Sequence, residues 1–183
     1  MDKQISVLLF DPPWAIAGSN PSRGLAIPYQ TMSVKAIANL DFTGLQRNGF
    51  AFIWVANSTF EEGIQMLRNN GYRPVEIVVW SKLTSSCLPA NSGGLVMQHT
   101  KELCLVGLKG RNLRYRKGIV RDMIESVVRE SGRKPDELYD IIEQLVPGGI
   151  YVEIFARIHN LRSGWYSVGL ELEGEGHMPT QFI

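Results

Sequence analysis

Short apolar runs alternate along the chain with amphipathic stretches, and this alternation predicts the fold class. We expect strands at Val7–Phe10, Phe50–Val55, Val75–Trp80, Leu103–Leu108, Tyr151–Phe155 and Trp165–Val168. Between the second and third of these, the segment Glu61–Asn70 has helical spacing and precedes Gly71, a favoured residue after a helix. The pattern indicates an α/β fold with a mainly parallel sheet and helices on both faces.

The most regular helical pattern lies late in the chain. Pro135 suits a first helical turn, and apolar side chains then recur at helical spacing until Pro147-Gly148-Gly149 ends the pattern. Two segments without strong periodicity, Gly18–Met32 and Lys82–Gln98, are rich in Ser, Gly, Pro and Asn. We expect them to be loops that flank a functional site.

Length and composition favour one domain over residues 1–183 with an ordinary core, since 44% of the residues are hydrophobic. No apolar run approaches the ~20 residues that span a bilayer, and no signal-peptide pattern is present, so we expect no membrane partner. The two cysteines, Cys87 and Cys104, and the three scattered histidines lack the spacing of metal ligands. We therefore expect no metal.

Positive charge is concentrated in one region. Residues 101–134 hold ten Lys or Arg and four Asp or Glu, so this stretch carries +6 although the whole chain carries only +1. The densest part contains Tyr115 and five cations: Lys109, Arg111, Arg114, Arg116 and Lys117. Clustered cations beside an aromatic ring suit a phosphate backbone and a stacked base. A solvated loop or a surface for an acidic partner remains an alternative.

The tetrapeptide Asp11-Pro12-Pro13-Trp14 follows the first predicted strand directly. In open α/β sheets, ligands bind beyond the carboxyl ends of strands. The Asp11 carboxylate and the Pro12 carbonyl can accept the two hydrogens of an exocyclic amine and orient its nitrogen lone pair. The two prolines stiffen the loop, and Trp14 offers a face on which a base can stack, worth ~1–3 kcal/mol. We interpret the motif as a site of adenine-amine methylation. The structural alternative is a proline-rich turn with Trp14 packed in the core.

A second group of polar residues follows the last two predicted strands. Arg157, His159 and Asn160 come after the strand Tyr151–Phe155, and Glu171 comes after the strand Trp165–Val168. An acid at the latter position commonly binds ribose hydroxyls. No glycine-rich fingerprint accompanies it, and a solvated loop with Glu171 at the surface is the alternative. A catalytic motif first and a nucleoside-binding turn last indicate a circularly permuted methyltransferase sheet of the Rossmann-like type.

These motifs give nearly the whole chain a resemblance to the METTL-type (DPPW) adenine-amine methyltransferases. The matching segments, besides Asp11–Trp14, are Gly49–Trp54, Lys101–Gly107, Lys134–Glu137 and Glu153–Arg157. The resemblance implies S-adenosylmethionine as the methyl donor. It also implies that Asp11 and Pro12 hold the target amine, and that the cofactor is contacted by Lys101, Phe155, Arg157, His159 and Asn160. Family members often pair a catalytic subunit with a homologous non-catalytic one. The expected location is the nucleus, or the cytoplasm for a microbial or phage member.

One segment and two departures refine this resemblance. Ser19–Gly24 is similar to a loop of the ciliate-type DNA adenine methyltransferases. Within the Gly18–Met32 loop we expect Ser22 and Arg23 to help close the loop over the base and the cofactor. Tyr29, together with Trp14, is a candidate to receive the base, and simple packing under the loop is the alternative for Tyr29. Leu170 stands where catalytic members carry a polar residue, which we expect to weaken cofactor binding by about 1 kcal/mol. Eukaryotic members also carry a strand before the DPPW motif, whereas this sequence begins ten residues before Asp11, as short microbial and phage relatives do. The alternative is a shortened product that lacks part of the cofactor pocket.

Three functions are compatible with these residues. We expect methyl transfer to adenine in DNA, by a subunit that works with a partner. The same chemistry on RNA is the second possibility, because the motif residues do not contact the 2′-hydroxyl that distinguishes RNA. The third is a non-catalytic scaffold on a methyltransferase fold, whose usual mark is decay of the acid motif. Here Asp11–Trp14 is intact.

Overall fold

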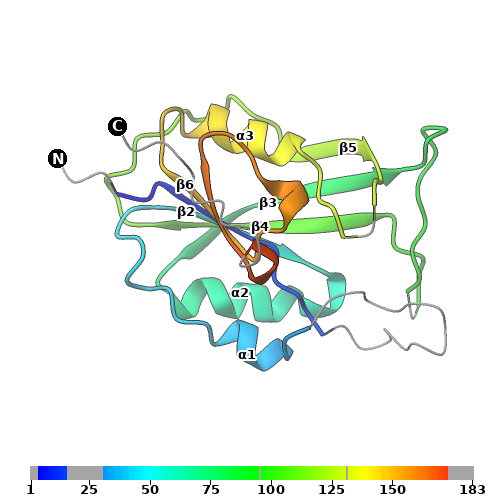
Figure 1. Cartoon of the computed structure of the whole chain (residues 1–183), viewed down its shortest axis with the longest axis horizontal. Helices are drawn as coiled ribbons and strands as arrows, with labels where there is room; N and C mark the ends of the chain where they lie inside the picture. Colours follow the sequence, from blue (N-terminus) through cyan, green and yellow to red (C-terminus); the bar gives the residue numbers. More distant parts are fainter. Residues whose placement is uncertain (1–3, 16–30, 95, 131, 173–183) are drawn as a thin grey trace.

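The computed structural model describes residues 4–15, 31–94, 96–130 and 132–172. Within them seven strands form one sheet in the order β5-β3-β4-β2-β1-β6-β7 (Figure 1). The strands are β1 Val7–Phe10, β2 Gly49–Val55, β3 Arg73–Leu83, β4 Lys101–Lys109, β5 Met123–Val127, β6 Tyr151–Ile154 and β7 Trp165–Val168. The helices are α1 Val34–Ala38, α2 Phe60–Asn69 and α3 Glu137–Leu145, with 3₁₀ turns η2 Asn57–Thr59, η3 Ile158–Asn160 and η4 Leu170–Leu172.

The sheet is mixed and mostly parallel. Four neighbouring pairs run parallel, namely β1 with β2, β1 with β6, β3 with β5 and β6 with β7. Among the strands of the described residues, β4 alone runs antiparallel to its neighbours, β2 and β3. The prediction of a mainly parallel α/β sheet is confirmed.

The order in which successive strands are added to the sheet changes direction between β1 and β6. From β1 the chain passes to β2 on one side, whereas from β6 it passes to β7 on the other. Phe10, the last residue of β1, pairs with both Ile53 and Ile154, so the ends of these strands lie together. Ligands of open α/β sheets bind beyond the carboxyl ends at such a switch point. We call the side of the sheet where β1, β2, β6 and β7 end the carboxyl edge.

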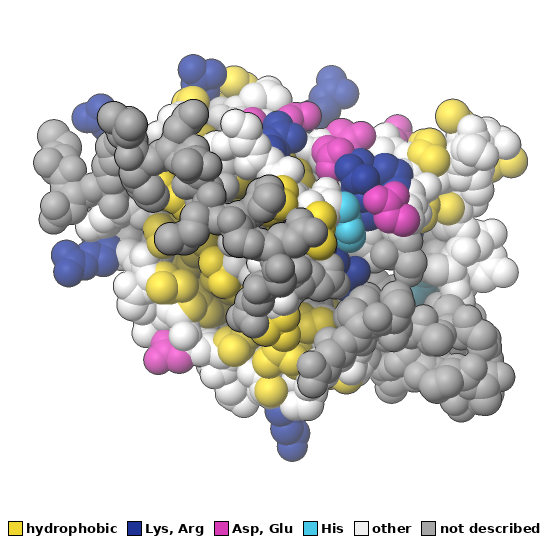
Figure 2. All heavy atoms as spheres, in the orientation of Figure 1, with side chains coloured by type: hydrophobic (Ala, Val, Ile, Leu, Met, Phe, Trp, Pro, Cys, Tyr) yellow, Lys and Arg dark blue, Asp and Glu magenta, His cyan; other side chains and the backbone are white. Residues whose placement is uncertain are grey.

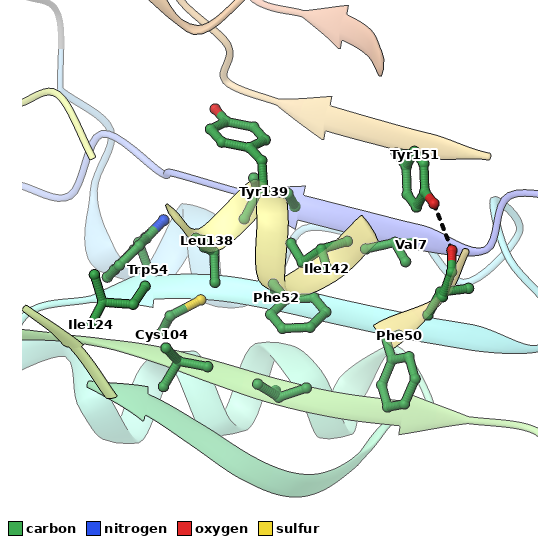
Figure 3. Close-up of a cluster of buried hydrophobic side chains, with 14 of the residues drawn as sticks. Val7, Phe50, Phe52, Trp54, Cys104, Ile124, Leu138, Tyr139, Ile142 and Tyr151 are labelled. Carbon is green, nitrogen blue, oxygen red and sulfur yellow. Dashed lines mark hydrogen bonds between the residues drawn. The ribbon is translucent and has the colours of Figure 1, made fainter. Parts of the chain in front are cut away.

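Helices cover both faces of the sheet, as predicted (Figure 1). Side chains of a strand alternate between faces, so Val7 and Leu9 of β1 pack in the cluster beneath α3, while Leu8 and Phe10 pack with α1 and α2. Figure 3 shows Leu138 and Ile142 of α3 over the first cluster. Burial on both faces explains the nearly continuous apolar run in β1.

Two short elements were not predicted, and several boundaries differ. Strand β5 has only five residues with one fully buried side chain, Ile124, so its sequence carries little strand periodicity. Helix α1 is also five residues long. Helix α3 begins at Glu137 rather than Pro135, and β6 ends at Ile154 rather than Phe155. Strand β3 extends to Leu83 because Lys82 and Leu83 pair with β5, which shortens the predicted Lys82–Gln98 loop.

Candidate active site

Hydrogen bonds hold the segment Asp11–Trp14, which follows β1, at both its ends. The Asp11 backbone N–H donates to the Ile154 carbonyl at the end of β6 (N···O 3.4 Å), and the Trp14 N–H turns back to the Pro12 carbonyl (2.8 Å). The Trp14 indole Nε1–H donates to the Trp54 carbonyl over 2.8 Å, and only 6% of this residue is exposed. The loop is therefore held against the ends of β2 and β6, with the Asp11 carboxylate at the switch point.

Asp11 ends a row of alternating charges along the carboxyl edge. Its Oδ1 lies 2.9 Å from Nζ of Lys134, which also lies 3.4 Å from Oε2 of Glu102. Glu102 in turn forms an ion pair with Lys82. Glu102 enters this row because β4 runs against its neighbours, so the amino end of β4 reaches the edge where β1 and β2 end.

This row is largely removed from water. The side chains of Asp11, Lys134 and Lys82 are 13 to 14% exposed, and Lys134 Nζ also lies 5.7 Å from the centre of the Trp54 ring. Burial alone raises the pKa of the Glu102 carboxyl, but the ammonium groups of Lys134 and Lys82 outweigh it and the net pKa is lowered. Glu102 is thus a charged anchor for the lysine that contacts Asp11.

A second buried carboxyl lies on β6. Glu153 is 1% exposed and accepts hydrogen bonds from the Tyr139 hydroxyl (3.0 Å to Oε2) and from Nδ2 of Asn160 (2.7 Å to Oε1). Burial raises its pKa to about 7; the bonds from Asn160 and Tyr139 lower it in part, and the nearby Asp11 raises it further. Two carboxyl groups therefore lie at the ends of β1 and β6: Asp11 is paired with a lysine, and Glu153 is held by neutral hydrogen-bond donors.

The same bonds orient the Asn160 amide. Its Nδ2 donates both to Glu153 and to the Tyr139 hydroxyl (3.1 Å). Its Oδ1 is buried and has no hydrogen-bond partner among the described residues. A buried acceptor without a partner costs about 1–3 kcal/mol, so this oxygen suits a ligand that donates a hydrogen bond, such as a hydroxyl or an ammonium.

The ends of β6 and β7 approach each other closely. Phe155 has φ +68°, a left-handed conformation that a bulky residue rarely adopts and that is concentrated at functional sites. The next residue, Ala156, donates its N–H to the Val168 carbonyl (3.0 Å). A Cβ added to Gly169 would lie 1.9 Å from the Ala156 carbonyl oxygen, so only glycine fits there. The turn η4, which contains Glu171, begins directly after this glycine.

Several predicted site residues meet at the switch point. Asp11 and Pro12 follow β1, while Phe155, Arg157, His159 and Asn160 follow β6. The Arg157 guanidinium lies against Gly132, beside the segment that carries Lys134, because a Cβ on Gly132 would be 2.9 Å from its Nη1. Figure 2 shows a histidine side chain beside acidic and basic side chains on the face turned to the viewer. The described ion pairs close to Lys134 include Arg129 with Asp136 and Arg133 with Glu130.

Other predicted residues lie elsewhere or are not described. Lys101 is exposed at the start of β4, and its role in cofactor binding stays a prediction. The Glu171 side chain is not described, and Ser22, Arg23 and Tyr29 fall outside the described residues. Trp14 packs in the core cluster beneath α1, as the structural alternative expected, so its stacking role also stays a prediction.

Sequence reasoning did not select Lys134, Glu102 or Glu153. A signal for Glu153 was present, because it is an acid inside the otherwise apolar strand Tyr151–Ile154, and acids are rarely fully buried unless paired. Lys134 precedes Pro135 and α3, but nothing in the sequence places it beside Asp11, since the two are 123 positions apart.

The basic residues lie at the opposite end of the sheet from Asp11. Lys109 pairs with Gly49, the first residue of β2, whereas Phe10 pairs with Ile53 near the end of that strand. Among the described residues, no helix has the length and hydropathy to cross a bilayer, and no three His, Cys, Asp or Glu side chains are grouped as metal ligands would be.

Comparison with known proteins relates this edge to one family. Residues 5–171 match the family model described as MT-A70. An N(6)-adenosine-methyltransferase MT-A70-like protein of Arabidopsis thaliana is 38% identical over 170 residues, which cover 92% of this chain and 24% of the relative. The N(6)-adenosine-methyltransferase catalytic subunit METTL3 of Homo sapiens is 35% identical, with 93% and 29% covered. The non-catalytic subunit METTL14 of Drosophila melanogaster is 32% identical, with 92% and 47% covered. The chain thus spans less than half the length of each of these relatives.

Proposed function

The chain belongs to the MT-A70 family, and from this premise we propose that it transfers a methyl group from S-adenosylmethionine to the 6-amino group of adenosine in RNA. The observation that carries the proposal is the position of Asp11. Its carboxylate stands at the switch point of the sheet, largely buried and paired with Lys134. An acceptor held in this way suits a reaction in which positive charge develops on a nitrogen.

Two acceptors of the β1 loop orient the amine. The Asp11 carboxylate has a second oxygen, Oδ2, besides the Oδ1 that faces Lys134, and the Pro12 carbonyl has two lone pairs, of which one accepts from the Trp14 N–H. Each acceptor takes one hydrogen of the amine, which turns the nitrogen lone pair toward the incoming methyl group. The Asp11 carboxylate then stabilises the charge on nitrogen and favours loss of the proton.

The residues around the switch point fit the methyl donor. Bound S-adenosylmethionine supplies an activated methyl group on a positively charged sulfur. The Lys134 ammonium suits the carboxylate of its methionine part, and the partnerless Oδ1 of Asn160 suits a hydroxyl or ammonium donor. Glu171 stands after β7, where an acid commonly binds ribose hydroxyls. We propose that the order of these parts along the chain is circularly permuted: the loop that holds the target amine follows the first strand, and the residues that bind the cofactor follow the last two strands.

RNA is favoured over the DNA substrate that the sequence suggested. The relatives compared above are named adenosine methyltransferases, and adenosine is the ribonucleoside. The Ser19–Gly24 segment, which pointed toward DNA, lies outside the described residues. The relatives also include a catalytic and a non-catalytic subunit, which supports a homologous partner for this chain.

A non-catalytic scaffold is the competing function. The intact Asp11 and its ion pair with Lys134 favour catalysis, because a chain that only supports a partner has no use for a buried acid at the switch point.

Transfer of labelled methyl from S-adenosylmethionine to adenine-containing RNA and DNA oligonucleotides of matched sequence tests the proposal. We expect label on RNA, and in the variant Asp11→Asn a rate about 10²–10³ lower, which is the usual cost of removing one group that stabilises transition-state charge. Label on DNA alone would overturn the choice of RNA. Cofactor binding without transfer to either, with and without a partner subunit, would favour the scaffold.

A further inference from the structure

The end of the sheet opposite Asp11 carries a groove with four exposed cations. The groove has a volume of about 430 Å³, and the side chains that line it include Arg73, Arg111, Arg114, Lys117, Leu113 and Tyr115. Arg73 comes from the start of β3, whereas the others belong to the segment 110–117 that follows β4. We call this feature the basic groove. It differs from the predicted cluster in two ways: Arg73 joins it, and Lys109 and Arg116 do not line it.

The cations of the basic groove are not used within the described part of the protein. No ion pair there involves Arg73, Arg111 or Arg114, and Lys117 contacts only the ring of Tyr115, 5.7 Å from its centre. Lys109, by contrast, donates to the Thr43 carbonyl (2.9 Å). Like charges crowded without counter-charges repel one another and destabilise the folded state, and a surface of one charge sign attracts ligands of the opposite sign, whose binding offsets the repulsion.

The segment that carries these cations is held firmly. Oδ1 of Asn48 accepts the backbone N–H groups of Arg111 (3.1 Å) and Asn112 (3.2 Å). Gly110 has φ +75°, and a Cβ there would lie 2.1 Å from the same Oδ1, so the turn requires glycine. The Tyr115 ring packs edge-on against Phe50 at 5.0 Å between centres. An exposed loop fixed in this way presents its charges with little loss of conformational entropy on binding.

We propose that the basic groove binds the phosphate backbone of the same RNA whose adenosine is methylated, at a point remote from the methylated base. The inference rests on the proposed function for the identity of the substrate. In the view of Figures 1 and 2, this end of the sheet lies at the left, and Lys and Arg side chains project from the rim there. Phosphate oxygens meet the cations, and the half-buried Tyr115 ring and Leu113 form the apolar floor of the groove.

The length of β2 sets the span between the two contacts. Gly49 lies beside the segment that begins at Lys109, and Val55 lies at the carboxyl edge near Asp11. Six residue steps of ~3.3 Å separate them, so the strand covers about 20 Å. At a spacing of about 3.4 Å per nucleotide, that of one strand of B-form DNA, about six nucleotides reach from one contact to the other.

Binding of fluorescent RNA at increasing salt, measured by anisotropy, tests the groove. The variant Arg114→Ala/Lys117→Ala removes two groove cations, and Lys35→Ala/Arg68→Ala removes two exposed cations from α1 and α2 as a matched control. We expect the groove variant to lower the slope of log affinity against log salt by about 1.4, since each phosphate contact of a single strand contributes about 0.7. The control should keep the parent's slope.

Strand length supplies a second readout. The groove variant should raise KM for RNA longer than about six nucleotides, with kcat unchanged, and should leave KM for an RNA of about three nucleotides as in the parent. Equal salt slopes in the two double variants would overturn the inference. RNA binding that the groove variant leaves unchanged would also overturn it, and is the result expected if the groove instead binds an acidic protein.

These outcomes separate the groove from the proposed function. Transfer that proceeds with no effect of the groove variant would leave the function in place and remove the inference. If RNA binding depends on the groove but the chain transfers no methyl group, the inference about the groove stands and the proposed function is removed.

Discussion

The ammonium Nζ of Lys134 lies 2.9 Å from Oδ1 of Asp11, although the two residues belong to segments 123 positions apart. Each side chain is at most 14% exposed, and Glu102 holds the lysine from its other side at 3.4 Å. The acid that the sequence identifies is therefore one member of a buried charge row, and its neighbours determine how it can act.

Lys134 and Lys101 provide a direct test of which lysine binds the cofactor. Lys134→Met should weaken binding of S-adenosylmethionine at least about tenfold, since it removes a charge-assisted contact, whereas Lys101→Met, at an exposed site, should leave it unchanged. Lys134→Met should also lower stability by on the order of 3 kcal/mol, because Asp11 and Glu102 lose their shared partner. Titration calorimetry and thermal unfolding measure the two effects. Weaker binding in Lys101→Met alone would restore the prediction made from the sequence.

Trp14→Phe separates the packing of this residue from a stacking role. The substitution removes the indole N–H that the buried Trp54 carbonyl accepts, so we expect a loss of about 1–3 kcal/mol in the free energy of unfolding. Phenylalanine keeps an aromatic ring in the core cluster, and KM for RNA should not change. Urea unfolding and steady-state kinetics check the two statements, and an increase in KM without loss of stability would instead favour stacking of the base on Trp14.

Gly169→Ala tests the close approach of β6 and β7. Its Cβ would lie 1.9 Å from the Ala156 carbonyl oxygen, so the two strand ends must separate, which typically costs 1–3 kcal/mol or slightly more. Because the turn carries Glu171, the variant should also lose stabilisation by S-adenosylmethionine in thermal unfolding. Gly44→Ala is the control, since no atom lies within 4 Å of a Cβ there. Equal melting temperatures for the two variants would show that the close approach of β6 and β7 is not required for stability.

The sequence predicts the framework well because local patterns determine it. Strands β1, β2, β4 and β7 were placed within one or two residues, since each is an apolar run bounded by polar or turn residues. Strand β5 and helix α1 were missed because five residues are too short for a period to be recognised. The antiparallel direction of β4 is a property of the whole sheet and leaves no local signal.

The residues of the site were predicted only in part, because only some of them are placed by local sequence patterns. Asp11, Arg157 and Asn160 follow strands, and parallel strands bring their carboxyl ends to one edge, so topology alone collects them. Lys134 precedes a helix and Glu102 begins an antiparallel strand, so their position beside Asp11 depends on strand order, which the sequence does not state.

Glu153 predicts a dependence of stability on pH. Its folded pKa is raised to about 7 from the ordinary 4.5, mainly by burial. Between these values the folded protein keeps a proton that the unfolded chain has released, so the folded state binds more protons and stability falls as pH rises. The stabilisation is complete below pH 4.5, is lost progressively up to about pH 7 and changes no further above it. Its size is about 3 kcal/mol, from roughly 1.4 kcal/mol for each pKa unit.

Glu153→Gln removes this titration while keeping the size of the side chain and an acceptor for Asn160 and Tyr139. We expect its free energy of unfolding to fall less than that of the parent as pH rises from 4.5 to about 7, so that the difference between the two proteins grows in favour of the variant. Glu61→Gln, which removes an exposed carboxyl from α2, is the control. Urea unfolding across this range measures all three proteins. A parallel course for the parent and Glu153→Gln would show that the carboxyl is already ionised in the folded state and that Asn160 and Tyr139 hold it as a carboxylate.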